Sequence, residues 1–354
     1  MSKVKSMPFL IVLLSFAFIL GGCGLLGGGS QEIDPPQSES YIEDESALEE
    51  NGTEDTAGEE TVSQSVMTEL YLIDKNGYVV PQTISLPSQQ GVAKQALEHL
   101  VVDGPVTNVL PNGFRAVLPA GTEVDVDIKD GHATVDFSKE FSNYEASDEL
   151  KILQAVTWTL TQFDSVETVK LQINGHELTE MPVNKTPITS NLSRATGINI
   201  DTSSTFDITN STPITLYYLG GEDNNYYYVP VTKRVDIKGD DMVTAVVNEL
   251  VKGPGSSSNL LTEFMYDVAL IAEPKIDKKE GKVALNFNEN IYGSFEEKIV
   301  SQSLIDVLVL SLTEQKGIES VEVLINGETS LVTEDGKKLS EPVNRPEKVN
   351  PSSL

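Results

Sequence analysis

The sequence predicts an α+β protein of two tandem two-layer domains, each a small, mostly antiparallel sheet with two helices packed on one face. Two stretches of each half repeat apolar residues at helical spacing, and shorter stretches alternate in the manner of strands. The same ordered landmarks then occur twice, offset by roughly 150 residues. That offset exceeds the period of a stacked repeat, so we expect two domains and not a solenoid.

Each half follows the order β-β-α-β-β-α-β and is long enough to bury its own core. The landmarks of the first half are Gly104-Pro105, Ala133-Thr134-Val135-Asp136-Phe137, Thr159-Leu160-Thr161, Asn174-Gly175 and Pro182-Val183-Asn184. Those of the second half are Gly253-Pro254, Val283-Ala284-Leu285-Asn286-Phe287, Ser311-Leu312-Thr313, Asn326-Gly327 and Pro342-Val343-Asn344.

In the first half, residues 70–73 and 78–81 predict two strands joined by a turn at Asn76-Gly77. Residues 91–102 carry an apolar stripe at helical spacing and predict the first helix. Gly104-Pro105 would end this helix, with Gly104 as a left-handed cap and Pro105 unable to continue it.

Residues 123–128 alternate acidic and apolar side chains, which predicts a hairpin with residues 133–137 and one buried face. Ser147 is a candidate hydroxyl cap for the second helix. Trp158, the only tryptophan, is expected to pack in the core. The stripe predicted to face the core consists of Leu150, Leu153, Val156, Leu160 and Phe163.

These features divide the 354 residues into six segments. They are a lipoprotein signal peptide (1–23), a disordered acidic tether (24–65), a first domain (66–185), an exposed linker (186–211), a second domain (212–346) and a C-terminal tail (347–354).

The amino end has the features of a secretory signal. Lys3 and Lys5 precede an apolar run over residues 8–20, and Leu20-Gly21-Gly22-Cys23 resembles a bacterial lipobox. In a lipobox the cysteine sulfur receives a diacylglyceryl group, so we expect lipid attachment, including palmitate, at Cys23. A plain signal peptide or an uncleaved anchor is the alternative, but the run is short for a membrane span. Cys23 is the only cysteine, so no intrachain disulfide is possible.

The charge is strongly negative, at −29. Twelve acidic residues lie between Gln31 and Glu60, and no Lys or Arg occurs from Gly24 to Asp74. Such a chain should avoid nucleic acid, and its acidic segment suits a spacer that holds the domains away from a membrane.

The sequence lacks the usual motifs of catalytic, metal-binding and cofactor-binding sites. His99, His132 and His176 have no metal-ligand spacing, and no phosphate-binding loop or nucleophile motif occurs. We therefore predict no catalytic residue, no cofactor and no metal site.

Two alternatives stay open. One is an enzyme acting on peptidoglycan through acids such as Asp125, Asp127 or Glu140, because paired carboxylates can hydrolyse glycosides. The other is a solute-binding lipoprotein with a cleft between its domains, although the halves are small and similar for that class.

One loop is a candidate contact site. Residues 107–121 are long for a connection in a compact domain, and such loops are often functional. We assign Asn112, Gly113, Phe114 and Arg115 as a candidate partner-contact loop. In the alternative interpretation, Phe114 enters the core and Asn112-Gly113 only turns the chain.

The motifs of the first half resemble the GerMN domain family. They are Asn112-Gly113-Phe114, Leu118-Pro119-Ala120-Gly121-Thr122, Ala133-Thr134-Val135-Asp136-Phe137, Trp158-Thr159-Leu160-Thr161-Gln162-Phe163 and Ile173-Asn174-Gly175. The second half matches in its helices and last strand but lacks the Asn-Gly-Phe loop, which puts a shared loop function in doubt.

The resemblance implies a sporulation and germination lipoprotein of an endospore-forming bacterium. It implies synthesis in the mother cell and a place on the outer face of its membrane, in the space around the forespore. It further implies a fold similar to ring-building motifs of secretion systems, and a role in positioning the channel complex between the two cells. The leading hypothesis is thus a non-enzymatic, lipid-anchored assembly protein whose partners are extracytoplasmic channel proteins and possibly peptidoglycan or the spore cortex.

Overall fold

The structure, a computed structural model, describes residues 65–351 except 89–90, 190, 204–208, 223–224, 238–240, 294–297 and 330. Cys23, the predicted signal peptide and nearly all of the predicted tether lie outside the described residues. Among the described residues, no helix is long and apolar enough to cross a membrane. All of these residues belong to one compact unit of the chain.

The first domain contains two separate sheets. In one of them, β1 (Ser65–Asp74) forms a long antiparallel hairpin with β2 (Val79–Pro87), and β3 (Phe114–Arg115) pairs with the other edge of β1. The other sheet has the order β4-β5-β6-β7. Its strands are β4 (Val124–Lys129), β5 (His132–Phe137), β6 (Thr168–Ile173) and β7 (His176–Glu177).

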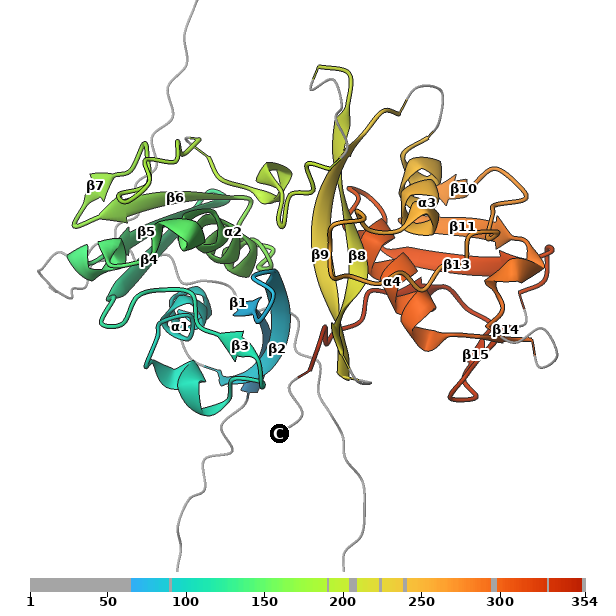
Figure 1. Ribbon diagram of the computed structural model, residues 1–354, viewed down its shortest axis with the longest axis horizontal. Coiled ribbons are helices and arrows are strands. Elements are labelled where there is room, and N and C mark those ends of the chain that lie inside the picture. The colour runs from blue at the N-terminus through green and yellow to red at the C-terminus, as the bar shows by residue number, and fades with distance from the viewer. Residues whose placement is uncertain are drawn as a thin grey trace, which may run out of the picture. The chain divides into compact units, whose positions relative to one another are not determined.

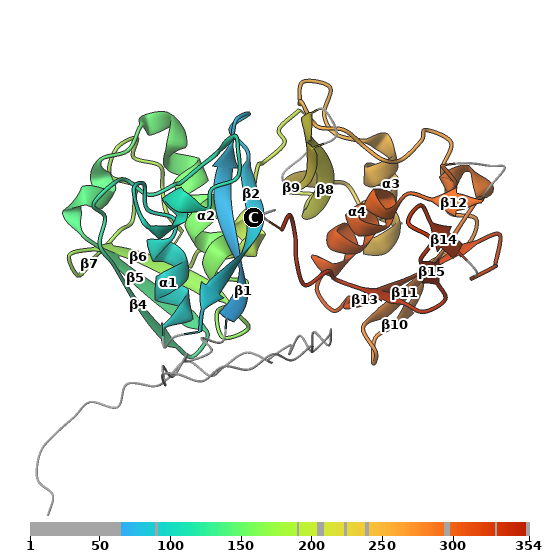
Figure 2. The same ribbon diagram turned by 90° about the horizontal axis from the view of Figure 1, so that it is seen from below.

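Two helices lie between these sheets (Figure 2). Helix α1 (Val92–Glu98) packs against β4, and α2 (Glu149–Leu160) packs against β1 and β6. Strand β5 pairs in parallel with β6, because α2 carries the chain back to the same end of the sheet. Each apolar helix face is therefore buried, and one continuous core results.

The second domain repeats this arrangement (Figure 1). Its hairpin is β8 (Thr212–Glu222) with β9 (Asn225–Val235), and its helices are α3 (Met242–Lys252) and α4 (Gln302–Thr313). Its main sheet consists of β10 (Lys275–Asp277), β11 (Lys282–Phe287), β13 (Ser320–Ile325) and β16 (Val343–Asn344). A further small sheet consists of β12 (Ile299–Val300), β14 (Leu331–Thr333) and β15 (Lys338–Leu339).

Five short 3₁₀ helices complete the described elements. They span Pro105–Asn108, Lys139–Ser142, Ala146–Asp148, Arg194–Thr196 and Glu289–Ile291.

The repeated hydroxyl landmark joins a helix to a hairpin in each domain. The backbone N–H of Tyr71 in β1 donates to Thr159 Oγ1 of α2 at 3.2 Å. In the second domain the N–H of Tyr217 donates to Ser311 Oγ of α4 at 2.8 Å. A buried backbone donor needs an acceptor, so a small hydroxyl residue is required at this helix position in both halves.

The repeated Asn-Gly turns also have a structural explanation. Asn174 and Asn326 both have positive φ, near 49° and 50°, a conformation that asparagine tolerates. The following glycine N–H donates to a side chain of the central strand, Asp136 in the first domain at 2.9 Å and Asn286 in the second, also at 2.9 Å. The strand motif and the turn motif are therefore one hydrogen-bonded unit.

The predicted α+β tandem fold and the element order are confirmed. Each domain has one layer more than predicted, because its hairpin forms a sheet of its own on the far side of the helices. The pairing of the strands on either side of the second helix is parallel in both domains, within an otherwise antiparallel pattern.

Three local predictions were wrong. Gly104 is extended, with φ −83°, and Asp103 takes the left-handed conformation instead. A Cβ on Gly104 would lie 2.8 Å from the carbonyl oxygen of Val101, so glycine is needed for close packing. Ser147 does not cap α2, which begins after a 3₁₀ turn. Leu150 is exposed because it lies at the edge of the apolar stripe, about 60° around the helix from Leu153.

The segment predicted as an exposed linker is partly buried. Leu192 exchanges two backbone hydrogen bonds with Val169 and thereby extends the main sheet of the first domain. Both Leu192 and Ile198 are buried, at 3% and 0% exposure. The polar composition concealed this role, because the few apolar residues that make the contact stand among many Ser, Thr and Asn residues.

The closing Pro182-Val183-Asn184 segment is held by the buried carboxylate of Glu149. This carboxylate accepts the N–H groups of Asn184 at 2.6 Å and Thr186 at 2.9 Å, and the hydroxyl of Tyr144 at 2.8 Å. Burial alone would raise the pKa of Glu149, but these donors outweigh it and lower the pKa to about 2.

Replacing Glu149 with Gln should destabilise the protein by about 2 kcal/mol at neutral pH, because buried donors lose a charged acceptor. The folded-state pKa is depressed, so this contribution is present above the unfolded pKa of about 4.3 and is lost as pH falls towards 2. Urea unfolding between pH 3 and 7 measures this, with exposed Glu177→Gln as the control. An equal pH dependence in the Glu149→Gln and wild-type chains would contradict the assignment.

Candidate functional site

The loop predicted to contact a partner reaches the second domain of the same chain. The Phe114 ring lies edge-on to that of Tyr227 in β9, with centroids 5.1 Å apart. The Tyr227 hydroxyl donates to Asp74 Oδ2 at 2.7 Å, back in the first domain. Phe114 contacts the hydrophobic clusters of both domains, so it is part of the junction between them.

The four residues of that loop separate into two groups. Phe114 is half-buried, and the Arg115 guanidinium forms a 2.7 Å ion pair with Asp148. Asn112 and Gly113 are exposed. They border a small cavity of about 160 Å³ lined by Lys75, Asn112, Gly113, Phe114, Gly221, Glu222, Asn225 and Tyr227. Contact with an external partner therefore stays a prediction, now centred on Asn112 and Gly113.

A buried ionic cluster forms the second part of the junction. Glu314 follows α4, and its side chain is 6% exposed. Arg194, from the segment after the first domain, donates to both oxygens of Glu314 at 2.9 Å. Arg345, which follows β16 near the end of the second domain, lies 3.1 Å from the same carboxylate. The Tyr217 hydroxyl adds a hydrogen bond of 3.0 Å, so four charged or polar groups share one buried centre.

Arg194 extends this cluster into the first domain. Its guanidinium lies 4.5 Å above the ring of Trp158, at a distance typical of a cation–π contact. Trp158 is 1% exposed, as predicted for a core residue, and its ring also packs against Tyr71. One arginine thus joins the aromatic core of the first domain to the carboxylate of the second.

The pKa of Glu314 reflects these contacts. Burial would raise the pKa of this carboxyl, but the positive charges of Arg194 and Arg345 outweigh burial and lower the pKa below its usual value. Glu314 is therefore ionised at neutral pH, and it needs both arginines because an unpaired buried charge is costly.

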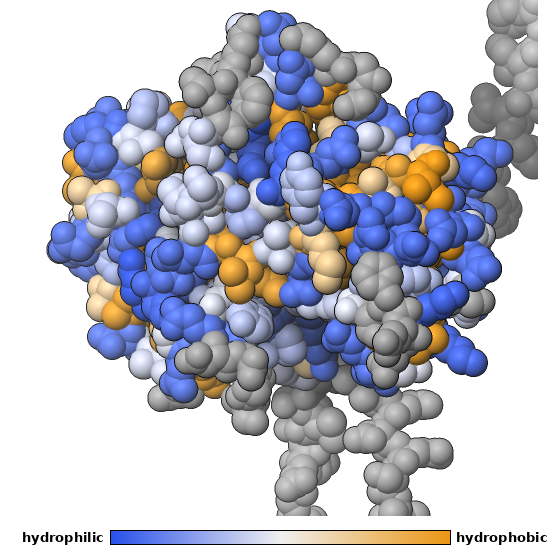
Figure 3. Space-filling model, turned by 45° about the vertical axis from the view of Figure 1, so that its right-hand side comes forward, coloured by the Kyte–Doolittle hydropathy of each residue, from blue (hydrophilic) through white to orange (hydrophobic). Residues whose placement is uncertain are grey.

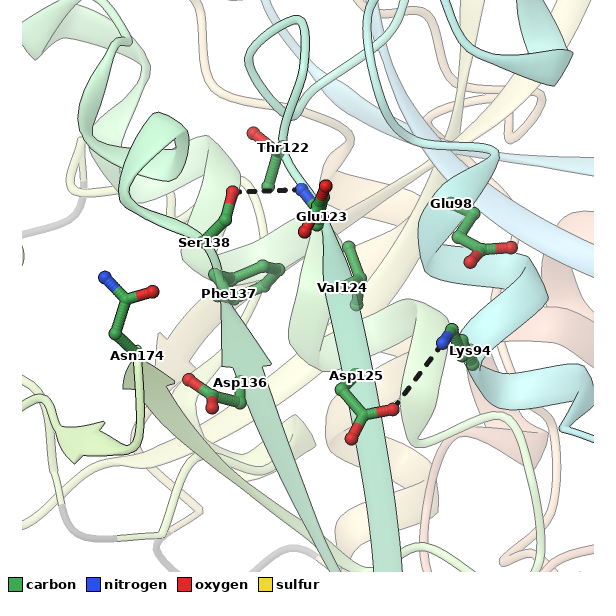
Figure 4. Close-up of a pocket in the computed structure, with 10 residues that line it drawn as sticks. All are labelled: Lys94, Glu98, Thr122, Glu123, Val124, Asp125, Asp136, Phe137, Ser138 and Asn174. Atoms are coloured by element: carbon green, nitrogen blue, oxygen red, sulfur yellow. Dashed lines mark hydrogen bonds and ion pairs between the residues drawn. The ribbon is translucent and has the colours of Figure 1, made fainter.

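The acids considered for an enzyme do not gather in one place. An open cavity of about 560 Å³ lies beside β4 and β5. Of Asp125, Asp127 and Glu140 only Asp125 lines it, together with the carboxylates of Glu98, Glu123 and Asp136 (Figure 4). Asp125 is 3.6 Å from the Lys94 ammonium group. Asp136, also in the lining, accepts the N–H of Gly175 with both oxygens. These carboxylates make structural contacts.

No group of three or more potential metal ligands occurs among the described residues. The three histidines lie on different elements. His99 follows α1, His132 begins β5 and His176 begins β7.

Comparisons with known proteins place this geometry in a family. The Germane family, described as sporulation and spore germination, matches residues 69–179 and residues 215–331. The chain belongs to the Germane family. Spore germination protein GerM of Bacillus subtilis (strain 168) is 53% identical over 355 residues, covering 96% of both chains.

One solved structure of a tandem protein agrees with the Germane assignment. The tandem GerMN domains of the sporulation protein GerM from Bacillus subtilis match with a TM-score of 0.76 and 56% identity. That match covers 80% of this chain and 99% of the solved chain. The first GerMN domain of the same protein is 68% identical over 36% of this chain and 98% of that chain, with a TM-score of 0.36.

The two Germane ranges omit part of the junction. Arg194 and Arg345 both lie after the Germane domain that precedes them, whereas Glu314 lies within the second range. The sequence interpretation missed these residues because a lone arginine or glutamate carries no motif. The repeat offset was the available signal, since Arg194 and Arg345 are separated by nearly the same distance as the other landmarks.

Replacing Glu314 with Gln should destabilise the protein by about 3 kcal/mol at neutral pH, since two partly buried arginines lose the buried anion between them. The folded-state pKa of Glu314 is depressed, so the wild-type advantage should be full above about pH 5 and decline as pH falls below about 4. Chemical denaturation at several pH values measures this, with exposed Glu341→Gln as a control. A difference from wild type that does not change with pH would contradict the charge assignment.

Proposed function

We propose that this Germane protein is a non-enzymatic assembly protein, anchored by lipid on the extracytoplasmic face of the mother-cell membrane. Its partners are the channel proteins that connect mother cell and forespore, with the peptidoglycan of the spore cortex as a second candidate. The observation that carries the proposal is the junction of the two domains. It joins them through Phe114, Glu314 and the two arginines into one surface suited to holding other proteins.

An exposed apolar segment supports a protein partner. Five large apolar side chains between residues 261 and 276 are exposed, with Tyr266 at 92% and Met265 at 53%. The full set is Leu261, Met265, Tyr266, Ile271 and Ile276. Figure 3 shows apolar patches separated by hydrophilic surface on the face brought forward there. Grouped exposed apolar side chains are typical of protein-binding surfaces.

The placement of the acids supports a role without catalysis. Asp125 lines the cavity beside β4 without Asp127 or Glu140, and Asp136 is bound to the backbone of a turn. A glycosidase needs two carboxylates facing one bond at a defined separation, with a raised pKa on the acid. Glu140 has the opposite shift, because the Ser138 hydroxyl lowers the pKa of its carboxyl.

The partner prediction can be tested in sporulating cells. A tagged wild-type chain should recover mother-cell channel proteins after crosslinking, and a Met265→Ser/Tyr266→Ser chain should recover several-fold less. Exposed Leu150→Ser, on α2 of the first domain, is the matched control and should recover the wild-type amount. Recovery of no channel or cell-wall component by the wild-type chain would overturn the proposed function.

The anchor prediction concerns Cys23. The wild-type chain should incorporate labelled palmitate and sediment with membranes, because two acyl chains give stable anchoring. A Cys23→Ser chain should incorporate none and appear in the soluble fraction. Wild-type protein that carries no fatty acid would contradict this part of the proposal.

A further inference from the structure

Two short segments cross from one domain to the other. We call residues 198–201, which follow the first domain, the first arm, and residues 349–351, near the end of the chain, the second arm. The first arm lies along β9 of the second domain and the second arm lies along β2 of the first domain. Each domain is therefore contacted by the arm of the other.

The second arm binds Thr83 of β2 through backbone and hydroxyl. The Thr83 N–H donates to the carbonyl of Val349 at 3.1 Å, and the Thr83 hydroxyl donates to the same oxygen at 2.8 Å. The N–H of Val349 donates to Thr83 Oγ1 at 2.8 Å. The Val349 side chain is 1% exposed, so it fills a closed apolar position.

Asn350 then connects the two domains through its side-chain amide. Its Oδ1 accepts the N–H of Tyr228 in β9 at 2.7 Å. Its Nδ2 donates to the carbonyls of Tyr228 at 2.8 Å and of Pro81 in β2 at 2.9 Å. All three hydrogen bonds join the Asn350 side-chain amide to backbone groups. They therefore do not depend on the identity of the neighbouring side chains.

The first arm repeats these contacts on β9. The N–H of Ile198 donates to Thr232 Oγ1 at 2.9 Å, and the N–H of Thr232 donates to the Ile198 carbonyl at 2.8 Å. Asn199 Oδ1 accepts the N–H of Val79 at 2.9 Å. Its Nδ2 donates to the carbonyls of Val79 at 2.7 Å and Pro230 at 2.8 Å.

Both arms thus bind through the same pair of residue types. A buried β-branched aliphatic residue, Ile198 or Val349, pairs with a threonine, and the next residue is an asparagine with positive φ, near 45° or 52°. Asparagine suits this position for two reasons. It tolerates the left-handed conformation, and its amide both donates and accepts hydrogen bonds. Aspartate could not donate to the two carbonyls.

We propose that the surface under the second arm is a peptide-binding site, specific for an extended segment with a β-branched aliphatic residue followed by asparagine. In the resting protein the chain's own Val349-Asn350 fills it. Because the second arm follows β16, the last strand among the described residues, it can leave without disturbing the main sheets. The matching segment in trans is the second arm of another copy of this chain.

The site resembles strand addition to a sheet edge, with one difference. Thr83, Pro81 and Tyr228 present backbone groups towards the arm, and Pro81 has no N–H to offer. The site therefore presents two backbone carbonyls and one backbone N–H to the ligand. A side-chain amide of the ligand can bond all three groups, and this requirement selects asparagine. The inference depends on these contacts and is independent of the proposed function.

A direct test measures peptide binding by fluorescence anisotropy. The protein is the chain ending at Lys348, and the ligand is a labelled peptide of residues 346–354. The shortened chain should bind the peptide, and the intact chain at least about tenfold more weakly, because its own arm competes. An Asn350→Asp peptide should bind at least about tenfold more weakly than the wild-type peptide. An unlabelled peptide of residues 196–203 should compete, since it carries Ile198-Asn199.

Two threonines of the same hairpin provide matched variants. In the shortened chain, Thr83→Val should weaken peptide binding, because the hydroxyl that bonds Val349 is removed. Thr68→Val should leave binding unchanged, since the buried Thr68 Oγ1 has no hydrogen-bond partner among the described residues.

The proposal is overturned if the shortened chain unfolds as cooperatively as wild type yet does not bind, or binds the wild-type and Asn350→Asp peptides equally. Where the shortened chain does not fold, the full-length Asn350→Asp chain replaces it. That chain must bind the wild-type peptide more tightly than the intact wild-type chain does, and failure to do so also overturns the proposal.

Discussion

The structure depends on covering two strand edges. β2 and β9 are each the last strand of their sheet, and an open edge exposes a row of unpaired backbone groups. The chain covers both edges with its own arms, and Asn199 and Asn350 bridge between them. Because each asparagine bonds two backbone groups of one domain and one of the other, covering the edges also joins the domains.

The junction combines three kinds of interaction with different sensitivities. Phe114 and Tyr227 contribute apolar contact, which is insensitive to pH and salt. The Glu314 cluster is buried and charged, so its contribution depends on both arginines and falls in acid. The arm asparagines contribute directed hydrogen bonds and therefore specificity for one relative arrangement. Loss of one kind leaves the other two, so the tandem resists any single change. An assembly protein of the proposed kind would present both domains to its partner as one surface.

Sequence patterns predicted the domains well because burial leaves periodic signals. The alternation at residues 123–128 and the apolar stripes gave the strands and helices, and Trp158 was placed in the core. Patterns could not predict that the hairpins form separate sheets, because hairpin and sheet strands have the same alternation. Leu150 was misplaced because it lies at the edge of the apolar stripe in the first turn of α2, where periodicity alone does not decide burial.

The junction was missed for a different reason. Arg194 and Asn199 are single polar residues of the predicted linker, and Asn350 is one of the predicted tail. Arg345 is a single polar residue at the end of the predicted second domain. Their contacts join residues more than a hundred positions apart, and only the fold brings them together. The candidate loop was predicted for its length, and its Phe114 does make an important contact, but within the chain.

The most direct test of the account is amide hydrogen exchange at Val79 and Tyr228, followed by NMR in the full chain. Both N–H groups donate to arm asparagines, at 2.9 Å and 2.7 Å. The account predicts strong protection of both amides in the wild-type chain. It also predicts that Asn199→Gly removes protection at Val79 and Asn350→Gly removes it at Tyr228, because glycine tolerates the positive φ of these positions but has no oxygen to accept the N–H. Rapid exchange of both amides in the wild-type chain would show that the edges are open and would contradict the account.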